Sequence, residues 1–386
     1  MRELASNDLI RGCATSALLL ALAASAAPLE VMADVTPQPP ASLCIDDGSG
    51  CPDSPGPTRT TIKWYPGHYV INQPYDNWST ALVDEAAGIK AVTGIKLRLT
   101  WKSLEPTRGN YDFGNLDRLL AYCKSKGLRV FAEVQERNFG GTNPGAVLPA
   151  YLANEANANG GWYIKPNNTG VMARLWVPAV MDRYIALQRA LAARYDSNDY
   201  FAAIGTEETA PDLGGVIPSD YTQAGWAAQL KRFATVSAGI WVHTPVMIKT
   251  NSLSGQLAGI INHSYLNRVG VGGPDVLPPP QGVSGDTIIR GVSSDTASIS
   301  VLSYLGKTSI SYDVQTPELG GKKGAFSPTQ LADFCVLTQG CNFMSWVHST
   351  GTPVDWPNDI KPYLAANPRP TVQACPENFK GGCVTN

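Results

Sequence analysis

Short apolar segments typical of β-strands alternate with longer amphipathic segments typical of α-helices, eight times over, between about residues 62 and 367. An open, doubly wound sheet is the alternative, but no GxGxxG motif follows an early strand. The sequence therefore predicts an α/β fold in which residues 61–367 form one (β/α)8 barrel, or TIM barrel. The expected strands are Gly67–Asn72, Ile95–Trp101, Leu128–Gln135, Phe201–Thr206, Trp241–Lys249, Arg268–Gly272, Ser309–Gln315 and Cys341–Val347. The expected helices are Ser79–Lys90, Phe113–Lys126, Val177–Tyr195, Tyr221–Ala238, Gln256–Leu266, Thr296–Leu305, Pro328–Thr338 and Trp356–Ala366.

Both ends of the chain differ from this central segment. Arg2 and Arg11 precede an apolar segment at residues 14–27, which is followed by small residues that suit cleavage. Residues 1–33 are therefore predicted to be a secretory signal peptide. Residues 34–60 are rich in Pro and Gly and are expected to form an arm or linker, and residues 368–386 a cysteine-containing tail. We expect a secreted or periplasmic protein with no membrane segment after signal cleavage.

Cysteine usage agrees with an oxidising compartment. Cys13 lies in the predicted signal peptide, and the odd number that follows it leaves at least one thiol without a partner in the chain. Cys123, inside a predicted amphipathic helix, is the expected free thiol. The pairs close in sequence are Cys44 with Cys51, Cys335 with Cys341, and Cys375 with Cys383.

The charge content excludes several classes of partner. Charged residues make up 16% of the chain and its net charge is −2, so no strong field attracts a polyanion such as nucleic acid. No CxxC spacing is present and the chain has only 4 His, so no zinc site is predicted. Aromatic residues reach 9%, which favours a neutral ligand held by stacking. No pattern predicts an oligomeric state.

One stretch of about forty residues carries a known pattern. It begins GIKLRLTWKSLEPTRGNYDFGNLDRLL at residue 94 and ends with Gly127-Leu128-Arg129-Val130 at the next expected strand. Through Arg98, Trp101, Glu105-Pro106 and the residues after them, it resembles the retaining glycoside hydrolases of clan A, especially family 42-like and family 5-like members. The resemblance implies a barrel that cleaves glycosidic bonds with two carboxylates and needs no cofactor.

The fourth expected strand ends in two adjacent glutamates, within FAAIGTEETA. Clan A enzymes carry their general acid/base Glu at this place, usually after an Asn, so the resemblance implies that Glu208 is the general acid. Glu207 stands where the Asn is usual and is expected to bind substrate. Adjacent carboxylates repel, which raises the pKa of one of them, as a general acid requires. The sequence leaves open which of the two is the acid.

The seventh expected strand, TSISYDVQTPELGGKKG, is where the resemblance places the nucleophile. Ser311, Asp313 and Gln315 share one face and are expected to point into the barrel. Gln315 then stands near the place of a nucleophilic Glu, and Glu318, three residues later, is the expected nucleophile by position and residue type. If Gln315 is the true equivalent, double displacement through that residue is impossible.

Other polar and aromatic residues at strand ends are candidate substrate contacts. Arg98 alternates with apolar neighbours, so it points inward and can hold a carboxylate ionised. Gln135 shares its strand face with Glu133, a reserve carboxylate. Asp275, after the sixth expected strand, is another reserve carboxylate with an expected positioning role. Trp101, Trp346 and His348 follow or end strands, and the two indoles are expected to stack on sugar rings.

The sequence thus predicts a secreted glycoside hydrolase that cleaves β-glycosidic bonds in a polysaccharide or oligosaccharide, with Glu208 as acid and Glu318 as nucleophile. Two alternatives stay open. One is a carbohydrate-binding barrel without catalysis, suggested by the replaced Asn and by Gln315. The other is an inverting hydrolase that uses a different carboxylate pair.

Overall fold

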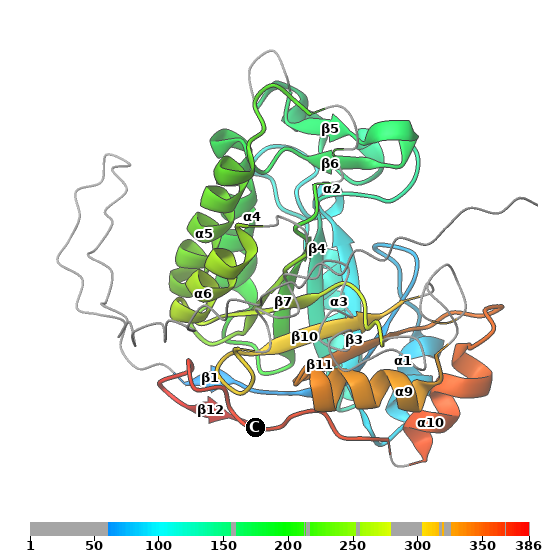
Figure 1. Ribbon diagram of the computed structural model, residues 1–386. Helices are drawn as coiled ribbons and strands as arrows, with labels where there is room; N and C mark the ends of the chain where they lie inside the picture. The colour runs from blue at the N-terminus through cyan, green and yellow to red at the C-terminus, as the bar shows by residue number, and fades with distance from the viewer. Residues whose placement is uncertain are drawn as a thin grey trace, which may run out of the picture. The chain divides into compact units, whose positions relative to one another are not determined.

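The computed structural model describes residues 61–155, 160–211, 213, 217–251, 255–278, 303–315, 319, 326–366 and 368–385 (Figure 1). The predicted signal peptide, the N-terminal arm with Cys44 and Cys51, and the expected nucleophile Glu318 lie outside the described residues. What the sequence predicts for them stays a prediction.

Eight strands close into a barrel in the order β2, β3, β4, β7, β8, β9, β10 and β11, with β11 beside β2 (Figure 1). Every neighbouring pair is parallel. Each strand overlaps one expected from the sequence, so the predicted (β/α)8 barrel is confirmed. The strands are β2 (Gly67–Ile71), β3 (Val92–Thr100), β4 (Arg129–Gln135), β7 (Phe201–Glu208), β8 (Val246–Lys249), β9 (Val269–Gly273), β10 (Ile310–Val314) and β11 (Phe343–Val347).

The helices that follow the strands begin and end close to their expected limits. Ser79 before α1 and Thr222 before α5 accept backbone N–H groups three residues later, which satisfies donors that a helix start leaves unpaired. Most of the expected helix Thr296–Leu305 lies outside the described residues. The observed helices are α1 (Thr80–Ala87), α2 (Trp101–Leu104), α3 (Gly114–Ser125), α4 (Pro178–Tyr195), α5 (Gln223–Ile240), α6 (Leu257–Leu266), α9 (Pro328–Asp333) continued by η5 (Phe334–Thr338), and η6 (Trp356–Ile360) continued by α10 (Lys361–Ala365).

The predicted start of the fifth strand lies before the observed start. The strand was expected from Trp241, but α5 ends at Ile240 and β8 starts only at Val246. The intervening backbone N–H groups, at residues 242–244, donate to the carboxylate of Asp196. They are therefore satisfied by a side chain and do not join the sheet.

The long connection between β4 and α4 contains structure of its own. Strands β5 (Trp162–Ile164) and β6 (Val171–Ala173) form an antiparallel hairpin, flanked by the short turns η1 (Pro144–Ala146), η2 (Ala150–Asn154) and η4 (Pro166–Asn168). The backbone N–H of Asn138 donates to the carbonyl of Val171, which ties the start of this connection to the hairpin. The connection follows the C-terminal end of β4, where barrel enzymes place their sites.

The predicted C-terminal tail packs against the opposite, N-terminal end of the barrel. Strand β1 (Ile62–Lys63) pairs in parallel with β12 (Cys383–Val384). Phe379 is buried and contacts Trp64, which in turn contacts Phe343 at the start of β11. A second apolar cluster therefore closes the barrel floor with side chains from both ends of the described chain.

Two of the three cysteine pairings suggested by the sequence are confirmed. Cys335 bonds to Cys341, and Cys375 bonds to Cys383. Cys123 is buried and free, as expected. The second disulfide holds β12 to the tail segment that precedes it. Within the described ranges, no helix is long and apolar enough to cross a membrane.

Removal of the tail disulfide is expected to destabilise the whole barrel. The double variant Cys375→Ser/Cys383→Ser should lose about 2 kcal/mol of unfolding free energy, because the crosslink restricts the unfolded chain. Urea unfolding of oxidised wild type and variant measures the difference. As a control, Leu337→Ala removes a side chain that is 64% exposed and should change little. An unchanged value in the double variant would mean that the tail unfolds separately from the barrel.

Candidate active site

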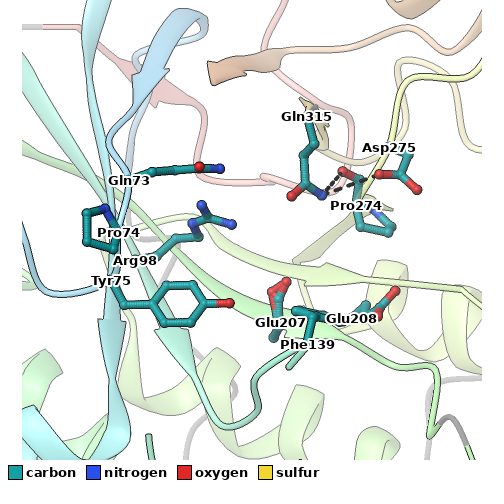
Figure 2. Close-up of a pocket in the computed structure, with 10 residues that line it drawn as sticks. All are labelled: Gln73, Pro74, Tyr75, Arg98, Phe139, Glu207, Glu208, Pro274, Asp275 and Gln315. Atoms are coloured by element: carbon teal, nitrogen blue, oxygen red, sulfur yellow. Dashed lines mark hydrogen bonds between the residues drawn. The ribbon is translucent and has the colours of Figure 1, made fainter. Parts of the chain in front are cut away.

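A cavity of about 680 Å³ opens where the barrel strands end, and Figure 2 shows its walls. Every lining residue lies at or just after the C-terminal end of a strand, which is the face where barrel enzymes carry out chemistry. Five of these residues were expected from the sequence. The lining consists of Gln73, Pro74, Tyr75, Arg98, Phe139, Glu207, Glu208, Pro274, Asp275 and Gln315.

Glu207 and Glu208 both reach the cavity, although neighbours on a regular strand point to opposite faces. The pairing of β7 with β8 shifts register between Gly205 and Glu208, and this irregularity breaks the alternation. Glu207 is buried and Glu208 is partly exposed. The Nδ2 of Asn251 donates to the Glu208 carboxylate, while its Oδ1 accepts the N–H of Ala210 at 2.9 Å. Asn251 therefore orients Glu208 against a fixed backbone.

The Glu207 carboxylate is held on both oxygens. Gln135 Nε2 donates to Oε2 at 3.1 Å, and Lys249 Nζ lies 3.4 Å from Oε1. Burial acts to raise the pKa of Glu207, but the positive charges of Lys249, Arg98 and Arg137 outweigh it and lower this pKa below its ordinary value. Glu207 is therefore an anion at neutral pH.

A buried charge cluster lies inside the barrel beneath the cavity. Lys96 Nζ is 2.6 Å from Glu133 and 2.8 Å from Asp313, and Lys249 Nζ is 2.7 and 2.8 Å from the same two carboxylates. Burial acts to raise the pKa of Asp313, but the two ammonium groups lower it to about 2. The inward direction predicted for Asp313 is confirmed. In the part of the chain that is described, no group of His, Cys, Asp and Glu is arranged to hold a metal ion.

Arg98 points into the cavity, as its alternation with apolar neighbours predicted (Figure 2). Its guanidinium lies 5.2 Å from the centre of the Tyr75 ring, so cation–π contact fixes its place on one wall. The side chain is buried, and its charge helps to lower the pKa of Glu207. Arg98 was predicted to keep a carboxylate ionised. Among the described residues, the carboxylate on which it acts in this way is Glu207.

Gln315 and Asp275 lie together on the wall opposite Arg98 (Figure 2). Gln315 Nε2 donates to the carbonyl of Pro274 at 2.8 Å and to Asp275 Oδ1 at 3.3 Å. These bonds join the end of β10 to the segment after β9. Asp275 is buried and supplies a third carboxylate to the cavity lining.

Four predicted substrate contacts are not among the residues that line the cavity. One is Gln135, which is fully buried beside Glu207, to which it donates. Trp101 is fully buried as the first residue of α2, where its Nε1 donates to Glu105 and its ring packs on Tyr184. Trp346 is also fully buried, and its Nε1 donates to His68 Nδ1 at 3.0 Å. Neither indole has a face open to a sugar.

His348 likewise has partners away from the cavity. Its Nε2 lies 3.2 Å from the carboxylate of Glu85 on α1, and its ring is 5.0 Å from that of Trp356. We therefore correct the predicted placement of Trp101, Trp346 and His348: their contacts are with helices and the core, and none lines the cavity.

Several site residues were not anticipated. Tyr75 and Phe139 are the aromatic side chains of the cavity lining, and Phe139 is 51% exposed at its edge. Lys96 lies two residues before Arg98 in GIKLRLT and shares its strand face, so its inward direction could have been predicted from the sequence. Lys249 is the last residue of β8 and Asn251 follows it, and no alternation of polar and apolar residues marks either of them as inward-facing.

Known structures share this barrel. The chain is similar to the catalytic domain of β-amylase from Paenibacillus polymyxa, at 10% identity and a TM-score of 0.58, over 80% of this chain and 100% of that one. It is also similar to endo-glycoceramidase II from Rhodococcus sp. (15% identity, TM-score 0.50, 79% and 81%). A third is β-galactosidase from the psychrophilic Marinomonas ef1 (11% identity, TM-score 0.52, 78% of this chain and 58% of that one).

These similarities confirm the predicted (β/α)8 barrel fold. No protein-family model and no curated protein sequence matches the chain.

Proposed function

We propose that this protein is a secreted glycoside hydrolase that cleaves β-glycosidic bonds in an oligosaccharide or polysaccharide. The observation that carries the proposal is the pair Glu207 and Glu208 at the end of β7, one held as an anion by Lys249 and Gln135, the other partly exposed and oriented by Asn251. An anion and a proton donor at one cavity are what cleavage of an acetal bond requires. The fold neighbours are named for enzymes that act on glycosides, which supports the same reaction.

In this proposal, Glu208 protonates the glycosidic oxygen as the sugar leaves. Glu207, whose charge is fixed, stabilises the positive charge that develops at the anomeric carbon. Tyr75 and Phe139 supply the aromatic surface that was expected from the indoles, since both line the cavity. Arg98 donates hydrogen bonds to sugar hydroxyl groups from one wall, and the side-chain carbonyl of Gln315 accepts from a hydroxyl group at the opposite wall.

Glu318 remains the proposed nucleophile on sequence grounds. Strand β10 ends beside the cavity, and Glu318 follows the lining residue Gln315 by three positions in the chain. A nucleophilic carboxylate gives a covalent glycosyl-enzyme and retention of anomeric configuration.

The inverting alternative is favoured by one observation, the presence of Asp275 in the cavity wall across from the glutamates (Figure 2). A carboxylate there would act as general base for a water molecule, and the product would have inverted configuration.

Stereochemistry of the first product distinguishes these mechanisms. The mature protein is incubated with a panel of β-linked oligosaccharides, and proton NMR records the anomer that forms before mutarotation. Retention supports Glu318 as nucleophile and inversion supports Asp275 as base. Binding of oligosaccharides without any turnover across the panel would contradict the proposed hydrolysis and favour the non-catalytic binding barrel.

A further inference from the structure

Two lysines lie inside the barrel, where an ammonium group is costly unless it is paired. Lys96 comes from β3 and Lys249 from the last position of β8, and both side chains are almost fully buried. Each is paired with the same two carboxylates, Glu133 and Asp313. Toward these carboxylates the two lysines are equivalent.

They differ in their reach toward the cavity. Lys249 Nζ lies 3.4 Å from Glu207 Oε1 on the neighbouring strand β7. Among the described residues, the partners of the Lys96 ammonium are Glu133, Asp313 and the ring of Phe131. Lys249 is therefore the lysine that connects the buried cluster to a cavity carboxylate.

Glu207 has little freedom in this arrangement. Its two oxygens face Lys249 and Gln135, and Gln135 in turn donates to Glu133 at 2.8 Å, so the same cluster holds it from both sides. Little solvent is available to replace a lost partner of Glu207, since only 3% of the residue is exposed. Loss of the Lys249 charge would leave a buried carboxylate with weaker compensation.

We infer that Lys249 is a positioning residue for the proposed hydrolysis, which holds the Glu207 carboxylate in place and charged beside Glu208. The inference rests on the proposed function. Lys249 does not line the cavity, yet in this inference it keeps Glu207 in the charged form and the position that the proposed reaction needs. Lys96 is equally buried and has nearly the same partners, but it does not contact Glu207. Its role is to pair with the carboxylates inside the barrel.

The ionisation of Glu207 is set by groups on every element around it. Lys249 is the largest of those that favour its charged form, followed by Arg98 and Arg137. The titratable and charged groups that face it are Tyr75 after β2, Arg98 on β3, Glu133 on β4, Glu136 and Arg137 after β4, Tyr184 on α4, Glu208 on β7, Lys249 on β8 and Asp313 on β10.

The test compares Lys249→Met with Lys96→Met in the full mature chain. Removing Lys249 raises the pKa of Glu207, so activity that needs its anion is lost at a higher pH than in wild type. We expect the acidic limb of the pH profile of kcat/KM to move upward by about one pH unit or more, as for loss of an opposite charge within hydrogen-bonding range. Lys96→Met should leave that limb in place.

Two double variants keep the test decisive if either single variant does not fold. Lys249→Met/Asp313→Asn and Lys96→Met/Asp313→Asn each remove one cation and one anion, so they have the same net charge and differ only in which lysine remains. Removing both members of a buried pair costs much less than removing one. The limb should move in the first double variant relative to the second, and equal profiles would overturn the inference.

A second readout does not depend on turnover. Carbon-13 NMR of protein labelled in its glutamate carboxyls follows the titration of Glu207, whose resonance is assigned by its absence in Glu207→Gln. The midpoint should rise in Lys249→Met and stay unchanged in Lys96→Met. If wild type cleaves no glycoside but this difference holds, the proposed function fails while the link from Lys249 to Glu207 stands. An unchanged midpoint in Lys249→Met would overturn that link.

Discussion

Glu208→Gln should lower kcat/KM by about a thousandfold on glycosides with poor leaving groups, within the range of about 10² to 10⁴ that a general acid contributes. The amide keeps the shape of the side chain and its contact with Asn251, but it has no acidic proton for the glycosidic oxygen. Aryl glycosides with strongly electron-withdrawing groups leave without protonation, so their kcat/KM should fall far less. Steady-state kinetics on one alkyl and one dinitrophenyl glycoside measure both effects.

Glu207→Gln is the matched control, since it makes the same change one residue away. The charge of the Glu207 carboxylate is proposed to stabilise the developing sugar cation, which forms with either leaving group. The variant should therefore lose activity to a similar extent on both substrates. This contrast between neighbouring residues separates proton donation from charge stabilisation. Equal losses on the two substrates in Glu208→Gln would contradict the assignment of Glu208 as acid.

Asp313→Asn should be among the most destabilising conservative changes in the barrel. The Asp313 carboxylate is 1% exposed and accepts from both buried lysines, so its loss leaves two ammonium groups with too little compensating charge. Breaking a buried ion pair on one side costs about 3–5 kcal/mol. Denaturant unfolding measures the loss. The control Asp333→Asn removes a partly exposed partner of Arg369 and should cost less than about 1 kcal/mol.

The pH dependence of this difference has a definite sign. The pKa of Asp313 is lowered from 3.8 to about 2 in the folded protein, so the folded state holds the charged form more strongly than the unfolded chain. Its stabilising contribution is present above about pH 4 and is lost as the pH falls toward 2. The gap in unfolding free energy between wild type and Asp313→Asn should narrow across that window. A gap that stays constant would show that the charge of Asp313 is not what stabilises the barrel.

The parts of the fold that repeat along the chain were open to prediction from sequence. The alternation of strand and helix segments predicted the barrel. Within single strands, the alternation of apolar and polar residues correctly predicted that Arg98 and Asp313 point inward. Local spacing also gave the pairs Cys335–Cys341 and Cys375–Cys383, because loops this short leave few other partners. These features depend on neighbours within a few residues.

The failures concern contacts that form only when the barrel closes. Trp101 looked like the exposed end of a strand, but Thr100 caps a helical turn there and the indole turns toward Glu105 in the core. Lys249 meets Glu133, Glu207 and Asp313, which lie on three other strands and far apart in sequence. No local sequence pattern predicts that these four charged side chains will meet inside the barrel.

The pairing of β1 with β12 has a consequence for the order in which the barrel can form. Ile62 and Cys383 are register partners, and Lys63 Nζ donates to the carbonyls of Asn198 and Phe201 at the same barrel end. The first described strand therefore has its partner more than 300 residues later in the chain. Contacts of such long sequence separation slow folding. The barrel floor cannot close until β1 and β12 are both available, so its closure waits for two segments that are far apart in the sequence.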